Sequence, residues 1–107
     1  MKISIHVPDE LIDSAIAHAK TAHWAKEVKW GRVDGSCEGH VLEQDPGSST
    51  GVYIRHWLGS SRLKSALELM AEGNHYEFSG LMCGDVEDGD VGSVLLQLMC
   101  FGERRHG

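Results

Sequence analysis

The densest apolar stretch of the chain lies near its end and predicts a buried helix. Over residues 91–101 the apolar side chains are Val91, Val94, Leu95, Leu96, Leu98, Met99, Cys100 and Phe101. Asp90 precedes them, where its carboxylate suits the free amides and the positive dipole end of a first turn, and Gly102 follows at a left-handed C-cap position. A bilayer span needs about 20 apolar residues. We therefore predict a helix inside a soluble domain, with four nearly inaccessible side chains: Val94, Leu95, Leu98 and Phe101.

The first part of the chain shows two different periodicities. Residues 3–7 alternate apolar with polar side chains, which is typical of a short strand, and Pro8 ends it because proline donates no hydrogen bond to a ladder. From Pro8 the apolar positions repeat at helical spacing, which predicts a helix that runs to about Trp24 or Lys29. The interval 21–35 fits either a continued helix or an irregular segment, so the end of this helix stays open.

The middle of the chain predicts a β-hairpin. Residues 39–43 and 52–58 each show a short extended pattern, and the residues between them are a concentration of turn formers. On one face of the second run the side chains would be Tyr53, Arg55 and Trp57. Because alternate residues of a strand share a face, this surface is aromatic and must be either covered or used.

Two further helical segments complete the pattern. Residues 63–70 have helical spacing and are stopped by Gly73 and Asn74, and residues 76–82 predict one or two amphipathic turns. The length is that of one ordinary domain, so we predict a single domain over residues 1–107. The fold class is α+β: a small antiparallel sheet, made of the N-terminal strand plus the hairpin, packed on three to four helices.

The composition argues against some partner classes. A formal net charge of −6 disfavours a protein that neutralises phosphates, because such a protein needs a basic face, and it permits a partner that is itself basic. Three cysteines at unrelated spacings favour free thiols in a reducing compartment. The N-terminal residues show no apolar signal region. We expect a cytoplasmic protein that contacts neither a membrane nor nucleic acid directly.

The C-terminal half carries a pattern found in phage proteins. It combines "LKSALELM" (residues 63–70), the aromatic residues Tyr76 and Phe78, an acidic loop and the run "GSVLLQLMCFGERRHG". This combination resembles a loose family of small uncharacterised bacteriophage and prophage proteins, whose members end in a helix of the form apolar-Leu-Gln-apolar-Phe-Gly-Glu. At residue level the likeness comprises the 63–70 helix, Leu96-Gln97 and Phe101-Gly102-Glu103, while the basic tail Arg104-Arg105-His106 departs from it. The resemblance implies a common fold, and it implies no catalytic activity.

Possible metal sites lack the spacing of known motifs. Cys37 and His40 have C-x-x-H spacing, and His75 with Cys83 could complete a tetrahedral zinc site, but the second pair lacks the close spacing of a zinc motif. The acidic residues of 84–90 resemble a cation loop, yet the sixth and twelfth positions do not carry the glycine and the acid that an EF-hand requires. We therefore predict no bound metal and no cofactor.

Catalytic signatures are also missing from the sequence. A cysteine and a histidine can form a nucleophile and its base, but Cys100 lies in the apolar stretch and Cys37 has no signature environment. No glycine-rich phosphate loop, no G-x-S-x-G elbow and no paired-carboxylate motif is present. The enzyme alternative is a metal- or thiol-dependent hydrolase that would use Cys37, His40 and Asp85.

The remaining candidates are residues that bind macromolecules. Tryptophan anchors interfaces because it buries a large rigid area at small entropic cost, and Trp24 and Trp30 flank two lysines. The alternative is that the tryptophans are core residues, and we favour it for Trp24 and Trp57. The acidic loop can steer the protein toward a basic cleft that normally holds nucleic acid. The candidate partner-binding residues are Asp85, Glu87, Asp88, Asp90, Trp24 and Trp30.

Three functional hypotheses follow from these observations. The first is a phage or prophage accessory protein that binds a host protein stoichiometrically, most concretely as an anti-CRISPR-like inhibitor of a bacterial defence system. The second is a small-ligand sponge, in which an oligomer pocket lined by tryptophan, arginine and histidine captures a signalling nucleotide. The third is the hydrolase. The first hypothesis is also compatible with a homo-oligomer.

Overall fold

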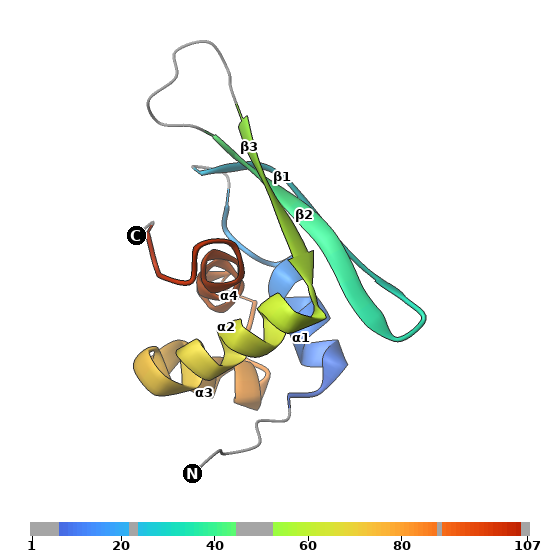
Figure 1. The fold of residues 1–107 in the computed structure, drawn as a ribbon. Helices are drawn as coiled ribbons and strands as arrows, with labels where there is room; N and C mark the ends of the chain where they lie inside the picture. Colours follow the sequence, from blue (N-terminus) through green and yellow to red (C-terminus); the bar gives the residue numbers. More distant parts are fainter. Residues whose placement is uncertain (1–6, 22–23, 45–52, 88, 106–107) are drawn as a thin grey trace.

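The computed structural model describes residues 7–21, 24–44, 53–87 and 89–105, which form a three-stranded antiparallel sheet packed against four helices (Figure 1). This confirms the α+β fold class. The strand order is β1-β2-β3, and the helices gather on one side of the sheet. In chain order the elements are α1 (Asp9–Ala17), β1 (Ala25–Val33), β2 (Ser36–Gln44), β3 (Tyr53–Gly59), α2 (Ser60–Gly73), α3 (His75–Cys83) and α4 (Asp90–Phe101).

The end of the first helix differs from the prediction. Helix α1 ends at Ala17, and the segment expected to continue it as far as Trp24 or Lys29 turns into strand β1. The third strand of the sheet is therefore β1. The strand predicted over residues 3–7 lies outside the described residues except for Val7, which is not in a strand.

A tight turn joins β1 to β2 and explains why the segment is extended. Asp34 and Gly35 have φ angles of 51° and 81°, and Val33 lies opposite Ser36 across a two-residue loop. A type I′ turn needs positive φ at both central residues, and Asp-Gly is one of its favoured sequences. Pairing with β2 then satisfies the backbone groups of β1 that face β2, which outweighs the helical spacing of its few apolar side chains.

The predicted hairpin is confirmed as β2 and β3. The two strands pair antiparallel from Gln44 opposite Tyr53 to Glu38 opposite Gly59. The turn predicted between them lies outside the described residues. Helix α2 follows β3 directly and ends before Asn74, as predicted, and α3 extends the predicted short segment to nine residues.

Helix α4 is the centre of the core. Every residue from Val91 to Cys100 is buried, and α4 contacts α1, α2, α3 and β3. Gly92 allows the closest approach, since a Cβ built there would lie 1.9 Å from the carbonyl oxygen of Ala15. Val94, Leu95 and Leu98 are nearly inaccessible as predicted, whereas Phe101 is only partly buried because it lies at the end of the helix.

The C-terminal end of α4 agrees with the prediction, and the N-terminal end differs from it. Gly102 adopts the predicted left-handed conformation, with a φ of 72°, and its N–H donates to the carbonyl of Leu98. At the other end Gly89, and not Asp90, occupies the N-cap position, so Asp90 belongs to the first turn. Its charge remains near the positive dipole end.

The residues on which the predicted resemblance rests have structural roles. Gln97 is 1% exposed, its Nε2 donates to Ser93 Oγ at 3.2 Å, and its Oε1 accepts the backbone N–H of Arg105 at 2.9 Å. Leu96 is fully buried, and Gly102 forms the C-cap. The Leu-Gln and Phe-Gly pairs thus hold the helix in the core and attach the chain that follows it.

None of the helices in the described ranges is long and apolar enough to cross a membrane.

Candidate functional site

The two faces of the sheet have different surroundings. On the inner face β2 and β3 bury Cys37, Val41, Glu43 and Leu58 against the helices. Alternation and register place twelve residues on the opposite face, and none of them is buried. We call this surface the outer sheet face; it consists of Glu27, Lys29, Gly31, Val33, Ser36, Glu38, His40, Leu42, Gln44, Tyr53, Arg55 and Trp57.

Trp57 is the most prominent side chain of the outer sheet face. It is 63% exposed, although a large aromatic side chain loses free energy by facing water. The guanidinium carbon of Arg55 lies 5.3 Å from the centroid of its ring, and the ring of His40 approaches edge-on with centroids 5.7 Å apart. These contacts hold the indole in place, and a preordered aromatic ring loses little entropy on binding.

A polar network surrounds this tryptophan. His40 Nε2 lies 2.8 Å from Glu27 Oε2, and the Lys29 ammonium lies 3.9 Å from the same carboxylate. The hydrogen bond with His40 lowers the pKa of Glu27 below its ordinary value of 4.5; burial opposes this change, and the positive charges of Lys29 and Arg55 add to it. Glu27 is therefore ionised at neutral pH and orients His40 beside Trp57.

A hollow lies beside Trp57 on the outer sheet face. Its volume is about 790 Å³, and its lining includes Trp57, His40, Lys29 and Glu38. Gly31 also lines it, and a Cβ built at Gly31 would meet nothing within 4 Å. The absence of a side chain there leaves open space next to an aromatic ring and two groups able to donate hydrogen bonds.

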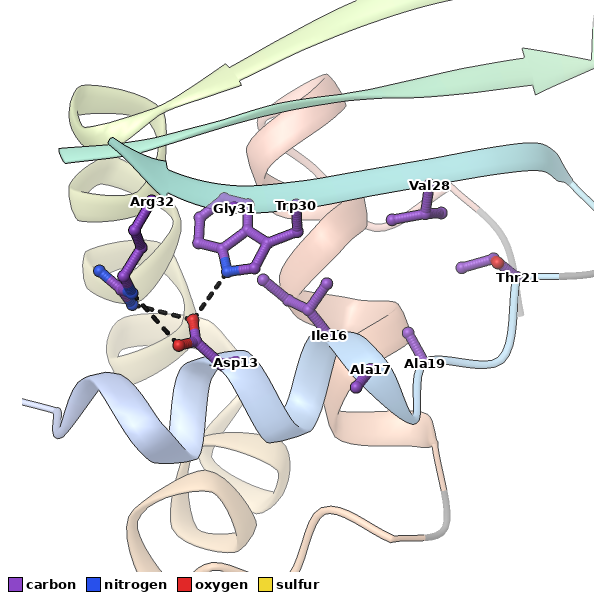
Figure 2. A pocket seen from close by; sticks show the side chains of 9 residues that line it. All are labelled: Asp13, Ile16, Ala17, Ala19, Thr21, Val28, Trp30, Gly31 and Arg32. Carbon is purple, nitrogen blue, oxygen red and sulfur yellow. Dashed lines mark hydrogen bonds and ion pairs between the residues drawn. The ribbon is translucent and has the colours of Figure 1, made fainter. Parts of the chain in front are cut away.

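A second cavity, of about 620 Å³, lies between α1 and β1 (Figure 2). Its polar end is closed by Asp13, whose Oδ1 accepts from Trp30 Nε1 at 2.8 Å and from Arg32 at 2.9 Å. Arg32 also donates to Asp13 Oδ2 at 3.2 Å and so binds the carboxylate through two nitrogens. The hydrogen bond with Arg32 lowers the pKa of Asp13 below 3.8, the bond with Trp30 assists, and burial opposes.

The other end of this cavity is apolar apart from Thr21. Figure 2 shows Ile16 and Ala17 of α1, Ala19 of the chain that follows it, and Val28 of β1 around the same space. Because alanine is small, α1 does not fill the gap beneath β1. The space remains as a groove along this strand, and we call it the β1 groove.

The described part of the acidic loop between α3 and α4 has exposed charged side chains. Val86 is buried, and the N–H of Asp85 donates to the carbonyl of Gly80 at 2.8 Å. Asp85, Glu87 and Asp90 are exposed, and Asp90 lies 3.9 Å from the Lys20 ammonium. Asp88 lies outside the described residues. The candidate acidic residues that are described are thus on the surface, and their role in partner binding stays a prediction.

The three tryptophans differ in burial: the core position favoured for Trp24 is confirmed, and the one favoured for Trp57 is wrong. Trp24 is 1% exposed and packs on Phe101 with ring centroids 5.6 Å apart, so it offers no surface to a partner. Trp30 is partly buried and donates to Asp13. Trp57, for which burial was favoured, is the exposed one. The alternation along β3 had already placed it on the face that Tyr53 shares.

The cysteine and histidine pairs are not assembled into the suggested metal site. Cys37 and His40 are three residues apart on one strand, so their side chains point to opposite faces of the sheet. Cys37 Sγ accepts a hydrogen bond from Arg32 at 3.1 Å, and His40 binds Glu27. In the parts of the chain that the structure describes, no three histidine, cysteine or acidic side chains group around a possible metal position.

The proposed hydrolase residues are separated for the same reason. Cys37 is buried under the sheet and His40 faces outward, so they cannot act as a nucleophile and its base. Cys100 is also buried, and burial raises the pKa of its thiol to about 12, which keeps it protonated at neutral pH. Cys83 is exposed on α3.

Comparison of the chain with protein-family models, with curated proteins and with solved structures gives no match. The candidate site is therefore argued from its own geometry.

Proposed function

We propose that this protein acts without catalysis, by stoichiometric binding of a partner protein through the outer sheet face. The observation that carries the proposal is Trp57, which is 63% exposed and held between Arg55 and His40. Tryptophan, tyrosine and arginine are the residues most enriched among interface hot spots, and this strand presents all three on one face. The face is rigid because β3 pairs with β2 and the opposite side of the sheet packs on helices.

The charge distribution supports separate roles for two parts of the protein: the sheet contacts the partner, and the acidic helices and loops attract it. Residues 25–44 and 53–59, which form the sheet, carry four basic and four acidic side chains and are neutral overall. Residues 9–20 and 60–105 carry eleven acidic and five basic side chains, which accounts for the net charge of −6. Charge of this kind accelerates encounter with a basic partner, while aromatic contacts determine how long the complex lasts.

The resemblance of the C-terminal half to small phage proteins supports a more concrete version. In that version the partner is a bacterial host protein, and the bound protein inhibits a nucleic-acid-guided or nuclease-based defence system. A domain of this size needs no active site for such inhibition, because occupying the partner's cleft is sufficient. The exposed acidic loop supplies the charge that such a basic cleft would attract.

The hollow beside Trp57 gives the small-ligand sponge one feature in its favour. A planar base could stack on the indole, with Lys29 close enough to the hollow to pair with a phosphate. Calorimetric titration with mono- and dinucleotides distinguishes the two functions. Saturable binding by the wild type that Trp57→Ala abolishes would support the sponge, and no heat of binding would support the protein-binding function.

The main test compares two exposed positions. A photo-crosslinking amino acid is placed at Glu38, which is exposed on the outer sheet face and lines the hollow beside Trp57, or at Tyr76, which is 82% exposed on α3 and serves as the control. Expression in a bacterial host should give one discrete crosslinked protein from position 38 and none from position 76. Equal crosslinking from both positions, or none from position 38, would overturn the proposal. The crosslinked partner can then be identified by mass spectrometry.

A phage plating assay tests the concrete version. Cells that carry a defined nuclease-based defence system should regain phage plaques when the wild-type protein is produced. Trp57→Ala and Arg55→Ala should lose the effect, and Tyr76→Ala should keep it. If all variants and the wild type leave plating unchanged across several defence systems, inhibition of such systems is the wrong version, although the crosslinking result would still stand.

A further inference from the structure

The outer sheet face is close to neutral, although the whole protein is strongly acidic. Its acidic side chains are Glu27 and Glu38, and its basic ones are Lys29 and Arg55, with Lys26 of the bulge at the rim. Three bases and two acids leave a small charge, while the helices on the other side of the sheet carry the acidic excess (Figure 1). Packed sheets are about 10 Å apart, so the acidic helices of two copies that met through this face would lie beyond a Debye length of about 8 Å.

The strand register arranges these groups in two neighbouring rows across the sheet. The rows are Lys29–His40–Trp57 and Glu27–Leu42–Arg55. On β1 the base of the first row is next to the acid of the second. On β3 the aromatic ring of the first row is next to the guanidinium of the second. Each row therefore carries the groups that attract those of the other row.

A two-fold axis that crosses the strands between the two rows pairs each row with the other. In such face-to-face packing the strands of the two sheets lie within about 30° of each other. Lys29 of one copy then lies over Glu27 of the other, and Arg55 lies over Trp57. Both contacts occur twice, as an isologous interface requires. Glu27 binds His40 through Oε2, and in the described ranges its Oε1 has only the 3.9 Å contact with Lys29, so it can accept a second ammonium.

The ends of the outer sheet face also match each other under this axis. Glu38 is exposed, and its side chain has no ion pair within the described ranges. It lies opposite Gly31, where a Cβ would meet nothing within 4 Å. At the other end of β1 the Lys26 ammonium lies 4.8 Å from the centroid of the Tyr53 ring and so reaches this face. The axis brings Lys26 of the second copy into the space over Gly31, beside Glu38.

We infer that the outer sheet face packs against the same face of a second copy and forms a reversible homodimer about this axis. Opposite charges and cation–π contacts set the register, and burial of Trp57, which is 63% exposed, drives association. The consequence rests on the proposed function: because the dimer covers Trp57, a partner protein has to displace one copy. Self-association thus regulates the site that binds the partner.

The size of the face sets the strength of this dimer. Three strands about 4.8 Å apart, with about seven residues each at roughly 3.3 Å, form a face of roughly 15 by 25 Å. A standard stable interface buries about 800 Å² on each side, which is more than a face of these dimensions offers. The dissociation constant should therefore be weak, at roughly 10–100 μM. A dimer of this strength can give way to a partner that binds more tightly.

Sedimentation velocity of the purified full chain, from about 1 μM to about 500 μM, measures the dimer directly. Glu27→Lys and Lys29→Glu each place like charges opposite one another and should weaken association at least about tenfold. The first variant makes the protein less negative and the second makes it more negative. A loss in both therefore does not come from overall repulsion. Circular dichroism checks that both variants keep their melting behaviour.

Mixing the two variants tests the two-fold arrangement. An equimolar mixture of Glu27→Lys and Lys29→Glu should regain the association of the wild type, because each variant then meets opposite charges on the other. Glu72→Lys, at an exposed position of α2, makes the same charge change as Glu27→Lys and should leave the dissociation constant within about twofold. If the mixture remains monomeric, or if the wild type is monomeric at every concentration, the inference is wrong.

Failure of the inference can be told apart from failure of the proposed function. Association is measured on the purified chain alone, so a monomeric protein overturns the inference and leaves a crosslink to a host protein intact. With the photo-crosslinking amino acid at Glu38, the dimer gives a product of two chains, which mass spectrometry distinguishes from a product with a host protein. Absence of the host product alone overturns the proposed function and leaves the dimer.

Discussion

Helix α4 and strand β3 are both rich in apolar and aromatic residues, yet they have opposite surroundings. Ten of the twelve residues of α4 are buried, whereas Leu58 alone is buried among the seven of β3. Helix α4 has neighbours on every side, in α1, α2, α3 and β3. The helices of the described residues lie on one side of the sheet only. Apolar content therefore identifies a core element only when the number of surrounding layers is known.

We propose from this difference that α4 provides most of the stability and that the outer sheet face is the region used for recognition. Burial of α4 removes large apolar areas from water, which is the main favourable term in folding. The outer sheet face contributes little to that term and keeps Trp57 available. The predictions that follow test this division, from the largest effect to the smallest.

Truncation within α4 should have the largest effect on stability. Leu95 is fully buried, so Leu95→Ala should lower the free energy of unfolding by about 2–5 kcal/mol. Trp57→Ala, which removes a larger but exposed side chain, should change it by less than about 0.5 kcal/mol. Urea denaturation of both variants gives the comparison. Similar losses in the two would show that β3 belongs to the core.

The Asp13 cluster, which joins α1 to the inner side of β1, should have an intermediate effect. Asp13→Asn removes the carboxylate that Arg32 binds and should cost about 1 kcal/mol, a value kept low because Asp13 is partly exposed. The folded pKa of Asp13 is lowered, so its stabilising contribution is present above 3.8 and is lost as the pH falls through the folded value.

The measurement for Asp13 is the difference in stability between wild type and Asp13→Asn across pH. The difference should be constant near neutral pH and shrink as the pH falls below about 4. A control variant, Glu72→Gln on the exposed part of α2, should show no such convergence. If the Asp13→Asn difference persists at the lowest pH at which the protein folds, the carboxylate charge is not what joins α1 to β1.

Charge reversal in the acidic loop should have the smallest effect on folding. Asp85→Lys combined with Glu87→Lys alters exposed side chains, and its effect on the free energy of unfolding should stay within about 0.5 kcal/mol. Its effect on partner binding should appear in the association rate and in the salt dependence. Surface plasmon resonance with the crosslinked partner measures both. An unchanged association rate would remove the loop from the recognition mechanism.

The sequence and the structure agree most closely in the second half of the chain. The stops at Gly73 and Gly102 and the apolar runs of α2 and α4 were predictable, because local caps and helical periodicity both indicate the same structure there. Strand β1 was not predicted, although Asp34-Gly35 is a hairpin signal in the sequence. Its few apolar residues fit a continued helix or an irregular segment, and only pairing with β2 makes the segment a strand.

The candidate site, like strand β1, could be predicted from the sequence only in part. The alternation of Tyr53, Arg55 and Trp57 already predicted an aromatic face that is either covered or used, and the sequence could not say which. Cys37 and His40 have the spacing of a metal pair, but that spacing brings side chains together on a turn and separates them on a strand. The β1 groove combines residues from α1 and β1, and no local pattern contains it.

The sequence by itself determined where the chain forms α2, α4 and the β2–β3 hairpin, because capping, turn chemistry and periodicity act within a few residues. The tertiary structure decided which of these surfaces meets water. Trp24 is enclosed because the elements around it close over its ring, and Trp57 is exposed because none of the described elements covers the outer side of the sheet. Burial depends on elements that are distant in the chain, so the same residue type serves as core at one position and as a candidate interface at the other.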